Sequence, residues 1–62
     1  MCLSTVYNEK KDPQNQIMAN VQRIEIGEDK VILTDLMDRQ TVINGKLLYV
    51  DLVGAVAVVQ KA

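Results

Sequence analysis

The fold is decided by residues 24–35, IEIGEDKVILTD, in which two stretches rich in isoleucine, valine and leucine flank a turn. Glycine and acidic residues at positions 27–29 tolerate the backbone angles of a tight connection, so the segment predicts a β-hairpin. Ile24 and Ile26 alternate with polar residues, as on a half-buried strand. Residues 31–37 are apolar on both faces for most of their length, which is typical of a central strand.

The chain before this hairpin predicts two more strands with a loop between them. Residues 1–7 alternate in the manner of a first strand. Residues 8–16 are polar, contain the only proline and predict a loop. In residues 17–26 the apolar positions change phase, so we expect a bulge or sharp bend near Gln22 and Arg23, as small barrels require at their corners.

The chain after the hairpin predicts further short strands. They are residues 40–43, residues 46–52 and residues 55–60, separated by turns at Asn44-Gly45 and Val53-Gly54. Asn-Gly is the strongest local turn pattern in the sequence. Short strands at regular spacing are typical of a sandwich or small barrel. We therefore predict an all-β fold, an SH3-like barrel of five or six short antiparallel strands, formed by residues 1–62 as a single domain.

The size of the chain indicates that it needs help to fold stably. It has 62 residues and one cysteine, so no intrachain disulfide can form. A domain of this size buries only about 60% of the surface that its unfolded chain exposes. Such chains usually rely on disulfides, a metal or a partner subunit. Nine Val, five Ile and six Leu, with no Phe or Trp, indicate a thin aliphatic core. We therefore expect a homodimer.

The charge balance argues against nucleic acid and membranes as partners. Seven basic residues against eight acidic ones give a net charge of −1, and the isoelectric point is about 5.1. Neither phosphate backbones nor anionic lipids should attract such a protein. No apolar run approaches the ~20 residues of a spanning helix, and residues 1–7 do not resemble a signal peptide. We expect a cytoplasmic protein, whose lone thiol stays reduced.

Residue types that catalyse reactions are scarce. The sequence has no histidine, so Cys2 lacks the usual base that would activate it as a nucleophile. Glu28 and Asp29 are adjacent acids that are best explained as solvated turn residues. Asp35 and Asp38 could hold a hard cation, but the spacing of an EF-hand is absent. The sequence therefore predicts a protein that is not an enzyme.

Cys2 is the candidate site residue, and it has two interpretations. A free cysteine often serves as a small buried hydrophobe. At position 2, however, its thiolate lies close to backbone nitrogens: its own α-amine if Met1 is removed, or its amide and the Met1 amine if Met1 is retained. Either set suits the tetragonal nitrogen-and-sulfur site of Ni(II) or Cu(II). A two-fold axis would bring two thiolates to one ion.

Several short motifs together resemble a known family. They are Met1-Cys2 before a short apolar strand, RIEIG at residues 23–27 leading into VILTDL at residues 31–36, and NGK at residues 44–46 followed by YVDL at residues 49–52. In this order and at this length they resemble the CooT family, small accessory proteins of carbon monoxide dehydrogenase maturation. The resemblance covers nearly the whole chain and is weakest over residues 8–16.

The resemblance implies an SH3-like barrel, a homodimer and one Ni(II) per dimer, held by the two Cys2 residues. It implies a metallochaperone that supports nickel insertion into carbon monoxide dehydrogenase. The expected partners are a second copy, the dehydrogenase and other nickel accessory proteins. We expect the dimer contacts on apolar residues of the first strand. The alternative is an SH3-like or Sm-like interaction module that binds a protein or RNA, with Cys2 structurally neutral.

Overall fold

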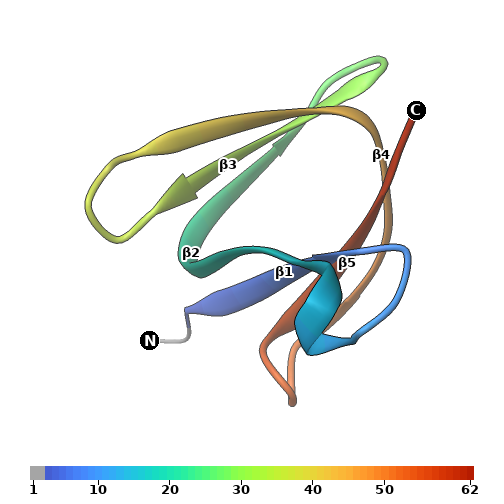
Figure 1. The fold of residues 1–62 in the computed structure, drawn as a ribbon. Coiled ribbons are helices and arrows are strands. Elements are labelled where there is room, and N and C mark those ends of the chain that lie inside the picture. Colours follow the sequence, from blue (N-terminus) through green and yellow to red (C-terminus); the bar gives the residue numbers. More distant parts are fainter. Residues whose placement is uncertain (1–2) are drawn as a thin grey trace.

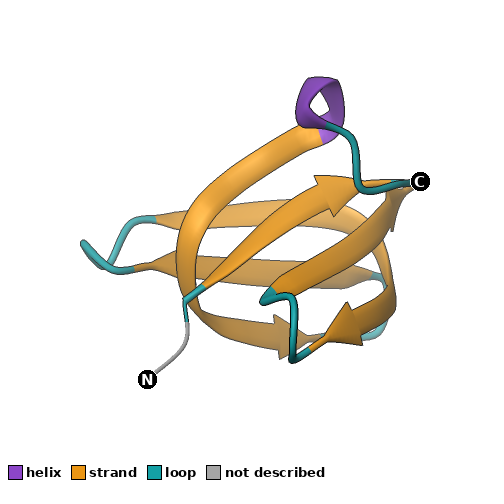
Figure 2. Ribbon diagram, turned by 90° about the horizontal axis from the view of Figure 1, so that it is seen from below, coloured by secondary structure: helices purple, strands orange, loops and turns teal. Residues whose placement is uncertain are grey.

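A computed structural model describes residues 3–62, which form a closed β-barrel (Figures 1 and 2). Its elements are β1 (Ser4–Asn8), the 3-10 helix η1 (Pro13–Asn15), β2 (Gln16–Ile26), β3 (Lys30–Asp35), β4 (Gln40–Asp51) and β5 (Val56–Lys61). Each strand pairs with the next along the chain, and β5 pairs with β1. The predicted all-β barrel is confirmed, with five strands. Among residues 3–62, no helix has the length and apolar character needed to cross a bilayer.

The seam between β1 and β5 closes the barrel with a parallel pairing. Thr5 lies opposite Val56 and Asn8 opposite Val59. The four pairings between consecutive strands are antiparallel, as predicted. In a chain of five strands that reverse direction at each turn, the first and the last run the same way. Closing such a ring therefore makes one pairing parallel.

The central hairpin forms as the sequence predicts. The N–H of Gly27 donates to the carbonyl oxygen of Lys30 at 2.8 Å. β3 pairs with both β2 and β4, so the prediction that it is not an edge strand is confirmed, although closure of the barrel gives every strand two neighbours. It ends at Asp35, two residues before the predicted limit, because the Asp35 side chain organises the next turn, as described below.

β2 bends where the change of phase predicts it. The register between β2 and β3 shifts between Val21 and Arg23. Val21 lies opposite Ser4 on β1 and opposite Asp35 on β3. The bend therefore lets β2 pair with both strands. The preceding residue, Asn20, has a φ of 56°, which an asparagine tolerates better than most side chains.

The predicted turn at Asn44-Gly45 is wrong. Residues 40–43 and residues 46–52 belong to one long strand, β4, which bends sharply around the barrel (Figure 1). Gly45 has a φ of 156°, and a Cβ there would collide with the carbonyl oxygen of Gln60 on β5. The glycine is therefore required by the close approach of two strands rather than by a turn.

The interior is thin and aliphatic, as the composition indicates. The core cluster consists of Val6, Val21, Val31, Leu33, Ile43, Ala57 and Val59. Val58 is also fully buried, although it alternates with core residues on β5 and so points to the outer face. Its cross-strand neighbours there are Tyr7 on β1 and Tyr49 on β4. The two aromatic residues of the chain therefore flank a buried valine outside the main core.

Candidate functional site

Cys2, the predicted metal ligand, lies outside the described residues, but the strand that leads to it is well defined. The Thr5 N–H donates to the carbonyl oxygen of Ala55 at 3.0 Å. Ser4 lies opposite Val21 on β2, so β1 is paired on both sides from its first residues. The position from which residues 1 and 2 extend is therefore fixed by two neighbouring strands.

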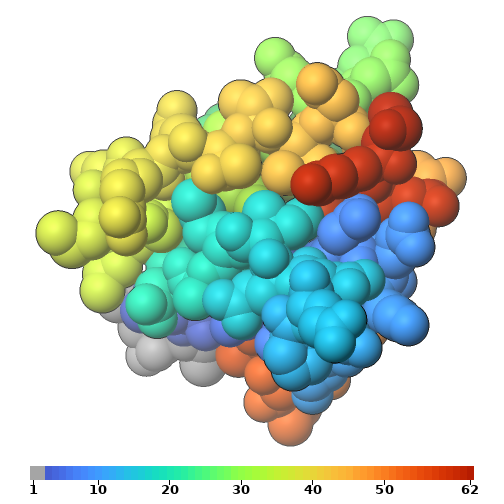
Figure 3. Space-filling model, viewed as in Figure 1, coloured from blue at the N-terminus to red at the C-terminus, as the bar shows by residue number. Residues whose placement is uncertain are grey.

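Exposed apolar side chains occur on two turns near the start of β1. Leu36 and Met37, in the β3–β4 turn, are 52% and 72% exposed, and Leu52 and Val53, in the β4–β5 turn, are 80% and 100% exposed. In Figure 1 β1 begins between these two turns. The β4–β5 turn, in orange, projects from the lower edge of the molecule in Figure 3. This end of the barrel therefore presents exposed apolar side chains on two of its turns.

Asp35 is a structural residue of the β3–β4 turn. Its carboxylate accepts hydrogen bonds from the N–H groups of Met37 and Arg39, each at 2.9 Å, and from Arg39 Nε at 2.8 Å. The hydrogen bond from the Arg39 backbone is the main cause that lowers the pKa of the Asp35 carboxyl, and burial opposes it. Asp38 accepts a hydrogen bond from Gln22 at 3.4 Å. The Asp35 carboxylate is thus occupied by donors, which disfavours the alternative cation site.

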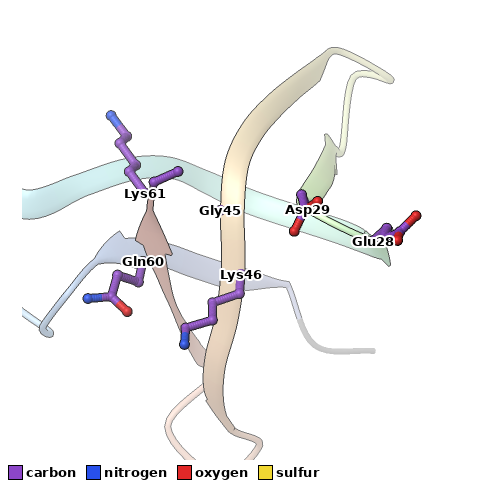
Figure 4. A pocket seen from close by; sticks show the side chains of 7 residues that line it. Glu28, Asp29, Gly45, Lys46, Gln60 and Lys61 are labelled. Carbon is purple, nitrogen blue, oxygen red and sulfur yellow. The ribbon is translucent and has the colours of Figure 1, made fainter.

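Glu28 and Asp29 line an open depression at the other end of the barrel (Figure 4). Lys46 on β4 and Lys61 on β5 contribute basic groups to it, and all four side chains are exposed. Figure 4 shows the carboxylates and the ammonium groups on separate elements. This arrangement agrees with the interpretation of Glu28 and Asp29 as solvated turn residues.

Lys10 and Lys11 are exposed in the loop that follows β1. This loop lies at the opposite end of β1 from residue 3. The basic pair is thus at the far end of β1 from Leu3, the first described residue. Within residues 3–62, no group of three or more His, Cys, Asp or Glu side chains is placed to hold a metal ion.

The sequence matches the family model of the CO dehydrogenase accessory protein CooT over residues 1–60. The chain belongs to the CooT family. Its fold is similar to a crystal structure assigned to CooT from Carboxydothermus hydrogenoformans, with a TM-score of 0.83 and 16% identity over 98% of both chains. At this identity the likeness shows the CooT fold and no more. None of the curated proteins compared matches the sequence.

Membership of the CooT family makes this chain an accessory protein of CO dehydrogenase rather than a member of an enzyme family. Cys2 lies within the matched residues. Sequence reasoning missed the exposed apolar residues of the β4–β5 turn. The sequence does contain a pattern that could have indicated them. Residues 47–60 are mostly apolar and carry a single charged side chain, Asp51, so more apolar residues are present there than one face of a strand can bury.

Proposed function

We propose that this CooT protein binds Ni(II) through Cys2 at the interface of a homodimer, with one ion per dimer. The bound nickel is cargo, which the protein supplies for insertion into carbon monoxide dehydrogenase. The observation that carries the proposal is the CooT match over residues 1–60, because it includes Cys2 and assigns an accessory role toward CO dehydrogenase. We also propose that residues 1–62 act as one domain in the cytoplasm.

The donor chemistry of the chain supports a nickel site at Cys2. The sequence has no histidine and one cysteine, so Cys2 is its single strong soft ligand. A structural zinc site normally requires four side chains from cysteine and histidine. A thiolate with neighbouring backbone nitrogens suits the tetragonal geometry of Ni(II). Two chains would supply two thiolates and two nitrogens, which completes four-coordination.

The barrel also supports the sharing of one ion between two copies. β1 is held by β2 and β5, so residues 1 and 2 extend from a fixed position. A two-fold axis near that position would place both Cys2 thiols at one point. Burial of the apolar turns at this end would also relieve the small core of a chain of 62 residues.

The delivery role can be tested in a CO-using microbe that lacks its own CooT gene. The nickel content of the purified CO dehydrogenase is measured at low external nickel, after complementation with wild-type protein or Cys2→Ser. We expect the wild type to restore nickel loading and Cys2→Ser to fail at equal protein level. Excess external nickel should rescue both strains. Equal loading by Cys2→Ser at low nickel would contradict the proposal.

A further inference from the structure

The Asn44-Gly45 pair, which lies inside β4 rather than in a turn, is a chemically reactive dipeptide. In such a pair the backbone nitrogen of glycine can attack the side-chain carbon Cγ of asparagine. The new N–Cγ bond closes a succinimide ring, the Cγ–Nδ2 bond breaks, and ammonia leaves with the glycine N–H proton. Water then opens the ring to aspartate or isoaspartate. Glycine favours this reaction because it has no side chain to hinder the attack.

The barrel holds Asn44 in a conformation from which the ring cannot close. Asn44 lies opposite Lys30 on β3, and Gly45 lies opposite Lys61 on β5 (Figure 4). A residue in an antiparallel strand has a ψ of about 135°. The bond between Cα and the carbonyl carbon of Asn44 must rotate far from that value before Cγ reaches the next nitrogen. The Asn44 side chain is exposed, so the backbone pairing is what prevents the reaction.

The peptide group between the two residues is fixed at both of its polar atoms. Its N–H, which belongs to Gly45, donates to the carbonyl oxygen of Asp29 at 3.0 Å. Its carbonyl oxygen, which belongs to Asn44, accepts from the N–H of Ala62 at 2.7 Å. Rotation at Asn44 turns this peptide group and breaks both hydrogen bonds. The reaction therefore requires β4 to separate from its neighbours on either side.

We propose that Asn44-Gly45 is a deamidation site that the folded barrel closes and that unfolding of β4 opens. Isoaspartate, one of the two products, also prevents the barrel from forming again. Its main chain runs through the side-chain carbon, which adds one backbone atom next to Gly45. There is no space for it, because even a Cβ on Gly45 would collide with the carbonyl oxygen of Gln60. Deamidation thus converts a reversible unfolding into a permanent loss of the fold.

The test measures deamidation at Asn44 in three states at the same mildly alkaline pH and temperature. They are the folded protein, the protein in guanidinium chloride, and a synthetic peptide of residues 40–46. Trypsin cleaves after Arg39 and Lys46, so digestion of the protein releases the same peptide, in which Asn44 is the single asparagine. Liquid chromatography with mass spectrometry separates the asparagine, aspartate and isoaspartate forms. The tryptic peptide of residues 12–23 is the internal control, because neither of its asparagines precedes a glycine.

We expect Asn44 to react at least about tenfold more slowly in the folded protein than in the free peptide or in guanidinium chloride, because only chains with β4 open can react. Asn44→Gln should suppress the reaction in every state, since glutamine would need to form a larger ring. The control peptide should change little. Equal rates in the folded protein and the free peptide would overturn the protection by the barrel. An unreactive Asn44 in guanidinium chloride would overturn the site itself.

The effect on folding is tested with chains aged in guanidinium chloride and then diluted into buffer. Size-exclusion chromatography separates compact chains from the rest, and Asn44→Asp is the matched control for the change in charge. Asn44→Asp should refold like the wild type, because the side chain is exposed and the backbone keeps its length. We expect isoaspartate to be depleted at least about tenfold from the compact fraction. Isoaspartate at its starting share among the compact chains would overturn the irreversible step.

Discussion

The backbone N–H of Thr5 donates to the carbonyl oxygen of Ala55 at 3.0 Å, which joins the start of β1 to the start of β5. This hydrogen bond begins the parallel seam that closes the barrel. It also attaches the segment leading to Cys2 to the turn that carries Leu52 and Val53. The segment that leads to the proposed ligand and the exposed apolar turn are therefore connected through one pair of strands.

Ala55 has a φ of 55°, a backbone conformation that costs an L-residue with a Cβ roughly 1–2 kcal/mol. Ala55→Gly should relieve this strain, although the extra freedom of glycine in the unfolded chain offsets part of the gain. We expect the free energy of unfolding to rise by up to about 1 kcal/mol. Urea denaturation measures it. Ala57→Gly, at a buried core position, is the control and should destabilise the protein; a loss for Ala55→Gly would contradict the strain argument.

Gly45→Ala should destabilise the barrel strongly. The new Cβ would collide with the backbone oxygen of Gln60, and alanine would also be strained at a φ of 156°. We expect a loss of roughly 3 kcal/mol or more in urea denaturation. Gly27→Ala is the matched control, because its Cβ would meet the flexible Lys30 side chain, with Cγ at 2.9 Å. Equal losses at both glycines would show that β4 and β5 do not approach as described.

Gly45 also shows where local sequence patterns fail. Asn-Gly favours a turn when only the neighbouring residues are considered. At Gly45 the deciding contact is with Gln60, fifteen residues away, and no local pattern contains it. In contrast, the hairpin that begins at Gly27 and the bend between Val21 and Arg23 depend on adjacent residues, and the sequence predicts both correctly.

The candidate site also has one part that the sequence identifies and one part that it does not. Cys2 can be identified from the sequence, because residue type and position alone suggest its donor chemistry. The exposure of Leu52 was not predicted, because residues 46–52 were assigned to one half-buried strand, whereas β4 ends at Asp51. Leu52 and Val53 are exposed because both lie in the β4–β5 turn, and the end of β4 is defined by its pairing with β5, whose last pair is Asp51 with Val56.

Asp35 should make stability depend on pH in the acid range. Its pKa in the folded protein lies below the ordinary value of 3.8, chiefly because of the Arg39 backbone hydrogen bond. The stabilisation is therefore complete above the unfolded pKa and is lost as the pH falls through the folded pKa, from about pH 5 downward. Urea midpoints at several pH values measure this dependence.

Asp35→Asn should lower the urea midpoint at pH 7 and flatten the acid dependence. Asp38→Asn, an exposed carboxylate in the same turn, serves as the control and should change both quantities little. If Asp35→Asn kept the wild-type acid dependence, the pH effect would belong to other carboxylates.

Dimer formation should make unfolding depend on protein concentration. A partner that binds the native chain alone raises stability by mass action. The thermal midpoint of the metal-free protein should therefore rise as the chain concentration increases from micromolar to hundreds of micromolar. A midpoint that is independent of concentration in the wild type would show that the fold is stable without a partner.

The central claim, that nickel is held by Cys2 of two chains, is tested most directly by a Ni(II) titration followed in the near ultraviolet. We expect thiolate-to-nickel absorption bands that reach their limit at one ion per two chains. The thiol and nitrogen ligands must lose protons, so the apparent affinity should fall as the pH is lowered. Cys2→Ser should show no bands. Nickel binding by Cys2→Ser with unchanged stoichiometry and affinity would contradict the account.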